Sequence, residues 1–470
     1  MNIQTLPGDV IRIIAEYCGQ ADCVSLERAC PTFVSFLAPR LYRAIIIDLG
    51  PRPLGPHVQY SYVNEQYPNV ACTLVRTLAG VKRCLQVLSD FPEWGNLVYR
   101  LEVRSNLPLS DFVVRKLLSG AFRNLGNLRI LEWAACPELP VDLLDLLPNK
   151  SLVEQLSGEF AIRSNQKFPV LEFPNLVRLN VRPFLTAECL QWLKAVIKNA
   201  KGLEQIHLAR FLDDKPQVGS GYAFVQQTGS REVRLLQEFF DIHGYQQKNL
   251  TSLRLMQFSH DNDAQRLFDA VDLANLQSLG LAGHDEMGSR CLLGELMDKT
   301  PKLRHLVLDW NCSAEMVRAY MDHLCLHSLD LTLHADGLQV LETVCGQSQL
   351  SALSVSVKCR FTAKDFAPLQ NCARLRTLRI PYNFQQRSWE NIMELTALRE
   401  LELVYVGDNV NGSGNATLSL STTNTLISCG ILSMWNDEYA QPLHYAGLLG
   451  ELRTHASLEK VVIDGHEHWL

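Results

Sequence analysis

The chain lacks a strong excess of either charge. Its 470 residues carry 44 basic and 50 acidic side chains, a formal net charge of −6, with no long run of one sign. Proteins that bind nucleic acid or anionic membranes usually carry a basic patch or stripe. We therefore expect neither a nucleic-acid partner nor a membrane partner.

Long apolar runs and paired cysteine motifs are also missing. No stretch approaches the roughly 18 consecutive apolar residues of a transmembrane helix, and Pro7, Asp9 and Arg12 interrupt any apolar core of a signal peptide. None of the 14 cysteines forms a Cys-x-x-Cys pair, so no zinc ribbon or thioredoxin-like motif is indicated. We expect unpaired cysteines in a reducing compartment, cytoplasmic and/or nuclear.

Familiar catalytic and metal-binding patterns are absent as well. The sequence contains neither a Gly-x-Ser-x-Gly elbow nor a His-Glu-x-x-His motif. His466, Glu467 and His468 lie at the end of the chain, where we expect a solvated tail rather than a metal site. These absences disfavour an enzyme, and we expect no catalytic residue, metal or cofactor.

A repeat of the form Leu-x-x-Leu-x-Leu, with conservative replacements, occupies most of the chain. Its second leucine recurs at gaps of 26, 27, 23, 24, 25 and 23 residues, namely at Leu253, Leu279, Leu306, Leu329, Leu353, Leu378 and Leu401. This period of roughly 20–29 residues is typical of leucine-rich repeats. Asn, Lys or Arg often precedes the first leucine, as at Asn127, Asn175 and Lys302.

The repeat predicts an α/β solenoid over residues 96–470. The alternating end of each unit predicts a short strand with one buried face. Such a strand cannot bury its apolar face alone, whereas stacked parallel strands bury a continuous leucine ladder. Helical stretches between the strands, such as Leu190, Leu193 and Ile197, place helices on the convex face and strands on the concave face. We expect two insertions, 210–231 and 408–424, to interrupt the array.

Residues 1–47 follow a different pattern and predict a small all-α module. Pro7 suits the start of a helix, after which Val10, Ile13, Ile14 and Tyr17 fall on one helical face. Three short amphipathic helices are expected here. Residues 48–95 are expected to be a linker or capping region.

The module begins with Leu6-Pro7, continues with the aliphatic residues Val10 and Ile14, has Asp22 where a second helix opens, and has Cys30 followed by Phe33. This combination resembles the F-box of fungal-type F-box proteins with leucine-rich repeats. The resemblance implies adaptor-binding residues at Leu6, Pro7, Val10, Ile14, Asp22, Leu26, Cys30 and Phe33. The alternative is a plain helical cap for the solenoid.

The resemblance implies a non-catalytic receptor of a ubiquitin ligase. The F-box would bind a Skp-family adaptor, and through it a cullin, while the solenoid holds an unknown protein substrate. One alternative is a Skp-bound scaffold without ligase function. Another is a leucine-rich-repeat regulator of a small GTPase.

The outward positions of the strands predict the substrate contact. The central strands, about 278–332, carry small and weakly charged residues there, whereas charges lie toward the ends, as in many interfaces. The predicted residues are Arg178, Arg182, His305, Asp309, Trp310, Asp330 and Arg379. Of these, Arg178, Arg182 and Arg379 are expected to steer an acidic or phosphorylated segment. Tight strand packing would equally explain the small central residues.

Overall fold

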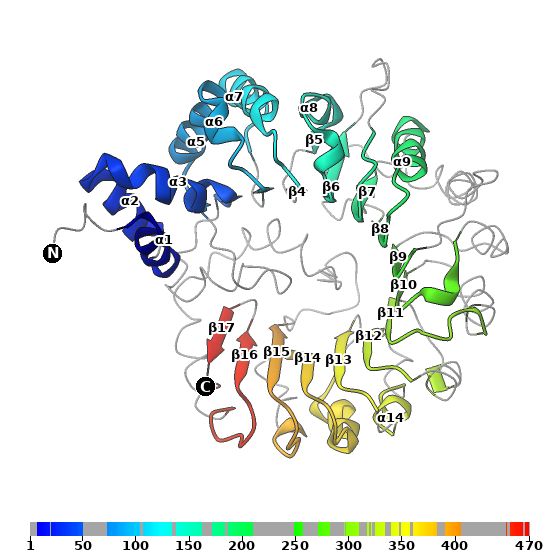
Figure 1. The fold of residues 1–470 in the computed structure, drawn as a ribbon. Coiled ribbons are helices and arrows are strands. Elements are labelled where there is room, and N and C mark those ends of the chain that lie inside the picture. Colours follow the sequence, from blue (N-terminus) through cyan, green and yellow to red (C-terminus); the bar gives the residue numbers. More distant parts are fainter. Residues whose placement is uncertain are drawn as a thin grey trace, which may run out of the picture. The chain divides into compact units, whose positions relative to one another are not determined.

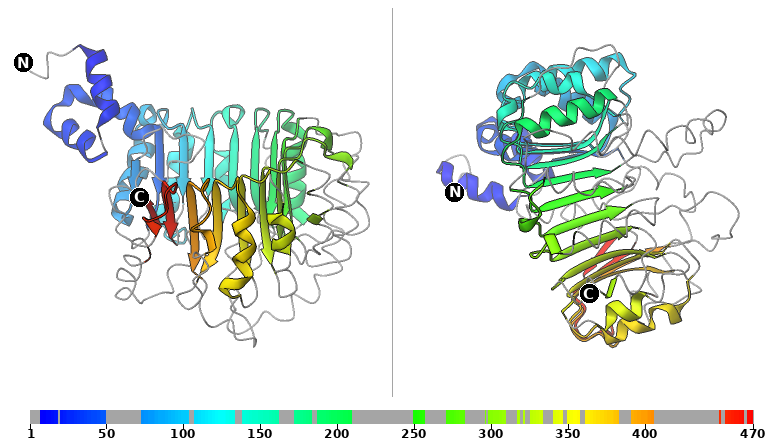
Figure 2. Two further views of the ribbon diagram at one scale, coloured as in Figure 1. Left: turned by 90° about the horizontal axis from the view of Figure 1, so that it is seen from below. Right: turned by 90° about the vertical axis from the view of Figure 1, so that its right-hand side faces the viewer.

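The computed structural model forms two compact units, one ending at Leu203 and the other beginning at Glu204. Each unit is an α/β structure built on a parallel sheet (Figures 1 and 2). The structure describes residues 7–18, 20–49, 73–103, 107–133, 138–161, 172–183, 187–209, 249–256, 271–282, 296, 298–309, 317–318, 321, 325–333, 340–346, 349–357, 361–382, 391–405, 448, 452–463 and 466–469.

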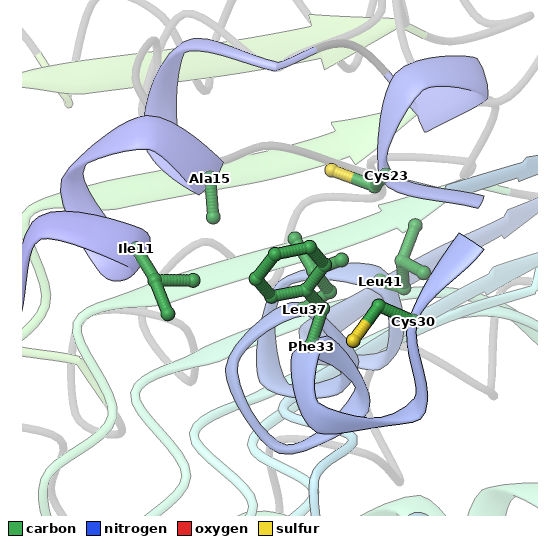
Figure 3. Packing of buried hydrophobic residues seen from close by; sticks show 7 residues of the cluster. All are labelled: Ile11, Ala15, Cys23, Cys30, Phe33, Leu37 and Leu41. Carbon is green, nitrogen blue, oxygen red and sulfur yellow. The ribbon is translucent and has the colours of Figure 1, made fainter. Parts of the chain in front are cut away.

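Unit 1 begins with the small helical module. Its elements are α1 (Gly8–Tyr17), α2 (Gln20–Ala29), the 3-10 turn η2 (Pro31–Phe33) and α3 (Val34–Arg43). Pro7 precedes α1, and Asp9 lies in its first turn. An acidic side chain there interacts favourably with the positive end of the helix dipole. The helices enclose one apolar core formed by Ile11, Ala15, Cys23, Cys30, Phe33, Leu37 and Leu41 (Figure 3).

The sheet of unit 1 follows directly from α3. Its strands are β1 (Ala44–Ile47), β2 (Thr73–Val75), β3 (Arg100–Val103), β4 (Ile130–Trp133), β5 (Leu139–Pro140), β6 (Gln155–Ala161) and β7 (Arg178–Pro183). They pair in parallel in the order β2, β1, β3, β4, β6 and β7, and β5 adds to β6. Helices α5 (Leu78–Asp90), α6 (Pro92–Gly95), α7 (Phe112–Asn124), α8 (Val141–Asp145) and α9 (Ala187–Asn199) lie on one side of this sheet (Figure 1).

Unit 2 repeats the parallel pairing in chain order. Its strands are β8 (Gln205–Ala209), β9 (Ser252–Met256), β10 (Ser278–Ala282), β11 (His305–Asp309), β12 (Ser328–Leu333), β13 (Ala352–Val357), β14 (Thr377–Tyr382), β15 (Glu400–Tyr405), β16 (Lys460–Ile463) and β17 (His466–Trp469). Each strand from β8 to β16 pairs in parallel with the next. Among the described residues, helical turns are represented by η4 (Leu273–Asn275), α14 (Val340–Cys345) and η6 (Ala363–Asn371).

The repeated leucines are register partners, as the sequence pattern predicts. Leu253, Leu279, Leu306, Leu329, Leu353, Leu378 and Leu401 lie opposite one another from β9 to β15. Each of these side chains is at most 2% exposed. Full burial of a leucine contributes roughly 1.5–3 kcal/mol relative to exposure, so this ladder is a principal source of stability in unit 2.

A repeated hydrogen-bond pattern joins the entry of each strand to the preceding repeat. The amides of Arg304 and His305, for example, both donate to the carbonyl of Gln277, at 2.9 Å each. The residue before the first leucine adds a side-chain bond, because the amide nitrogens of Asn127 and Asn175 donate to the carbonyls of Asn96 and Ser151. The recurring asparagine in the sequence therefore satisfies backbone acceptors between repeats.

Residues 73–95, within the segment 48–95 that was expected to be a linker or capping region, form β2, α5 and α6 in unit 1. The solvated tail expected around His466–His468 is wrong, because these residues form β17 and pair antiparallel with β16. Pairing here gives hydrogen-bond partners to a strand edge that would otherwise be open.

Gly158 provides a test of the packing in unit 1. Its φ of 144° is strained for other residues, and a Cβ there would lie 2.3 Å from the carbonyl oxygen of Trp133 on β4. We expect Gly158→Ala to lower the free energy of unfolding by roughly 1–3 kcal/mol or more. Chemical denaturation measures this value. Gly202→Ala is the matched control, because a Cβ at Gly202 meets nothing within 4 Å, and equal effects of the two changes would contradict the packing argument.

Candidate functional site

Helix α1 has two apolar faces, and only one of them packs inside the module. Ile11 and Ala15 point into the core (Figure 3). Val10, Ile13 and Tyr17, by contrast, are 39%, 55% and 87% exposed. Their spacing of three and four residues places them along one side of the helix. We call Val10, Ile13, Ile14 and Tyr17 the outer face of α1.

The sequence-predicted adaptor residues divide between this surface and the core. Pro7, Val10 and Asp22 are exposed, whereas Ile14 and Leu26 are half-buried. Cys30 and Phe33 are only 6% and 3% exposed, because they pack between the helices. They hold the module together rather than offering contact surface, and Leu6 lies outside the described residues.

The helical module is tied to the beginning of the sheet. The side chain of Gln20 on α2 bonds both backbone groups of Leu74 on β2: its Nε2 donates to the carbonyl at 3.2 Å, and its Oε1 accepts from the amide at 3.0 Å. Tyr42 on α3 also packs edge-on against Trp94 on α6, with ring centroids 4.8 Å apart. These contacts join α2 and α3 to the sheet and helices of the same unit.

A buried charged cluster lies on the sheet of unit 1. Arg100 on β3 donates from Nη2 to Glu102 at 2.7 Å and to Glu132 on β4 at 3.2 Å. Gln155 on β6 also donates to Glu132, at 3.0 Å. The three charged residues are at most 6% exposed. Removing one partner of such a pair typically costs about 3–5 kcal/mol, which makes this cluster a structural element.

In unit 2, a second polar network crosses several strands on the face opposite the leucine ladder. Arg254 on β9 donates from Nη2 to Nε2 of His305 on β11 at 3.1 Å. Its side chain passes over Gly280 on β10, where a Cβ would lie 2.7 Å from Cγ of Arg254. Because arginine cannot accept a hydrogen bond, Nε2 of His305 is the acceptor and the imidazole is neutral. Asp330 on β12 lies 3.8 Å from the same nitrogen.

Burial dominates the protonation of this network. It raises the pKa of Asp330 to about 6, while the charges of Arg254 and Arg379 act in the opposite direction. Burial, followed by the charge of Arg254, lowers the pKa of His305 to about 4. The same causes lower the pKa of His207 on β8 to about 3, and its Nε2 lies 2.8 Å from the hydroxyl of Ser252 on β9.

The predicted substrate residues are brought together only in part. His305, Asp330 and Arg379 lie on the same face of unit 2, but Arg379 on β14 pairs with Glu402 on β15 at 3.4 Å. Arg379 therefore already has an acidic neighbour in this structure, and its expected role in steering an acidic segment stays a prediction. Arg178 is half-buried on β7 of unit 1.

Several predicted features lie wholly or partly outside the described residues. For Arg182 and Asp309 only the strand position is described, on β7 and β11. Trp310 and the insertions 210–231 and 408–424 lie outside the described part of the chain.

Sequence reasoning missed His207, Ser252 and Arg254. All three occupy outward positions of repeats that the pattern identifies, at Leu203 and Leu250. The same rule that selected His305 would therefore have found them.

Comparison with known proteins identifies no family for this chain. Neither a scan against protein-family models nor a search of curated proteins finds a match. Within the described ranges, no helix is long and apolar enough to cross a membrane. In the same part of the chain, no group of three or more His, Cys, Asp and Glu side chains is placed to hold a metal ion.

The buried histidines predict acid sensitivity of unit 2. His207 and His305 have folded pKa values below their usual 6.5, so unfolding takes up protons and stability falls as pH drops below about 6.5. Asp330 opposes this trend between about pH 4 and 6, because its raised pKa lets the folded state hold a proton that the unfolded state has lost. Two histidines outweigh one carboxyl, so we expect net destabilisation on acidification.

A substitution isolates the histidine contribution. His207→Gln removes the titrating group, so we expect it to reduce the loss of stability between pH 7 and pH 5 by about 1–2 kcal/mol. Denaturant titrations of parent and variant at both pH values measure this difference. His327→Gln is the control, since His327 is exposed. An unchanged pH slope in His207→Gln would show that His207 titrates normally.

Proposed function

We propose that this chain is a substrate receptor of a Skp–cullin–F-box-type ubiquitin ligase. Residues 1–47 act as the F-box and bind a Skp-family adaptor, and the repeats of residues 96–470 form a leucine-rich-repeat solenoid that holds a protein substrate. The observation that carries the proposal is the outer face of α1. Val10, Ile13 and Tyr17 are exposed there, although the module already has a complete core behind them.

The outer face of α1 has the character of a helix-in-groove contact. Its apolar side chains recur at positions i, i+3, i+4 and i+7, the pattern with which an amphipathic helix fills a hydrophobic groove. Pro7 and Asp22, two further residues of the expected adaptor contact, are also exposed. Cys30 and Phe33 contribute indirectly, by fixing the helix that carries it.

The repeat architecture supports the solenoid half of the proposal. The leucines of successive strands lie in register, and each strand entry is hydrogen-bonded to the preceding repeat. Stacked repeats leave one row of outward positions per strand for a partner, without disturbing the core. Strands on a concave face and helices on a convex face complete the proposed arrangement.

No catalytic residue is needed for this role. A receptor that holds a substrate beside a charged ubiquitin-conjugating enzyme accelerates transfer by raising the effective concentration of substrate lysines. The chain would contribute binding and orientation, while partner subunits carry the reactive thioester.

Adaptor binding can be tested on the outer face of α1. We expect Ile13→Ala with Tyr17→Ala to weaken adaptor binding by ten- to several-hundred-fold, because fully burying one aliphatic side chain contributes about 1.5–3 kcal/mol. Both residues are exposed, so the melting temperature of the chain should change little. Titration of the full-length chain with a purified Skp-family adaptor measures the affinity.

Phe112→Ala is the matched control, because Phe112 is 76% exposed on α7, outside the module. Undiminished binding by the α1 variant would assign the helices to a capping role. Recovery of the adaptor without a cullin from native extract would instead support a scaffold without ligase function.

A further inference from the structure

The residue before each strand of unit 2 occupies the same edge of the sheet. Its carbonyl accepts the two amides that enter the next strand, as for Arg376, which accepts from Arg399 and Glu400 at 2.8 and 3.0 Å. This pair of hydrogen bonds recurs in the repeats from Gln277 to Arg399 and holds each residue at the same place in its repeat. In β10 to β16 the residues at this position are Gln277, Arg304, His327, Ser351, Arg376, Arg399 and Glu459.

This edge carries a concentration of exposed positive charge. We call Lys302, Arg304, Arg374, Arg376 and Arg399 the basic edge; all five are exposed. Among the described residues, Arg304, Arg374 and Arg376 have no carboxylate partner, and Lys302 donates to the amide oxygen of Asn275 at 2.7 Å. Like charges held side by side are unfavourable, so an anionic partner would relieve a cost that the isolated chain bears.

The exception within the basic edge is an exchangeable ion pair. Arg399 lies 2.9 Å from Glu459, but the two side chains are 60% and 57% exposed. Exposed pairs of this kind contribute only about 0–1 kcal/mol. A partner carboxylate could therefore replace Glu459 at little cost.

At the corresponding edge of unit 1, one arginine already has an acidic partner. Arg129, at the equivalent position before β4, pairs with Glu154 before β6. Its guanidinium also lies 5.5 Å from the centroid of the Tyr99 ring. The comparison indicates that unpaired cations are not required for the fold at this position.

The basic edge is also hollowed at one end. A depression of about 340 Å³ is lined by Arg376, Thr396, Ala397, Arg399, Ala456, Ser457, Leu458 and Glu459. It gives a bound side chain a place beside two guanidinium groups. Arginine binds carboxylates and phosphates through two parallel hydrogen bonds, which favours such anionic groups here.

We propose that the basic edge binds an acidic segment of a partner protein. The inference rests on the proposed function and names the class of substrate. Neighbouring strands lie about 4.8 Å apart, so Arg304 and Arg399 are about 19 Å apart along the edge, which an extended segment of about six residues spans. Nucleic acid is the weaker occupant, because the chain's net charge is −6 and its sequence has no long run of basic residues.

The test uses the full-length chain and a fluorescein-labelled decaglutamate peptide, with binding followed by fluorescence anisotropy. We expect binding that weakens with added salt. Arg374→Glu with Arg376→Glu should reduce the affinity by at least about tenfold. Arg83→Glu with Arg123→Glu is the matched control: it changes the net charge equally at two exposed positions on α5 and α7, and should alter the affinity less than about twofold. If the first variant is poorly folded, Arg374→Gln with Arg376→Gln takes its place.

Competition experiments show which anionic group binds best and whether a protein segment or a nucleic acid supplies it. Displacement of the peptide by a phosphoserine peptide supports the proposal and ranks phosphate against carboxylate. The proposal is overturned if the parent does not bind the peptide, or if both double variants lose the same amount of peptide affinity. It is also overturned if a single-stranded oligonucleotide binds more tightly than either peptide. Adaptor titration of the parent chain separates the two proposals: if the parent binds the peptide but not the adaptor, the receptor assignment is wrong and the basic-edge proposal stands.

Discussion

Each repeat offers only one short strand, and such a strand cannot bury its own apolar face. The stacking of leucines in register, from Leu253 to Leu401 in unit 2, removes these side chains from water. At the start of the strands, pairs of backbone hydrogen bonds to one carbonyl of the preceding repeat hold that register. Since this ladder uses only one face of the sheet, the outward positions and the edges remain available for other interactions.

The outward faces are used largely for internal pairing. Arg100, Glu102 and Glu132 satisfy one another in unit 1, and in unit 2 Arg254 bonds His305 while Arg379 pairs with Glu402. Partly buried charges need such partners, because the cost of desolvation is otherwise unmet. These networks help to fix neighbouring strands, and their charges are already engaged before any partner arrives.

The repeat period predicted the strands and their register, because side-chain alternation and the spacing of leucines depend on local sequence. It did not predict that Arg379 would pair with Glu402, although both occupy the same outward row on adjacent strands. The N-terminal pattern placed Val10 and Ile14 on one face, but it could not separate surface from core for Cys30 and Phe33. That distinction depends on how three helices meet. The strand at His466–Trp469 was missed because it depends on pairing with β16, which the local sequence does not reveal.

The surfaces available to partners differ in whether their arginines already have carboxylate partners. Arg379 on the sheet face would have to give up Glu402 to receive an anion, from a site where it is only 12% exposed. Arg374 and Arg376 are exposed, and within the described residues they have no carboxylate to lose. Desolvating and re-pairing a half-buried charge costs more than engaging an exposed one. An anionic partner therefore gains more at the edge of the sheet than on its face, and the apolar outer face of α1 remains suited to a different kind of partner.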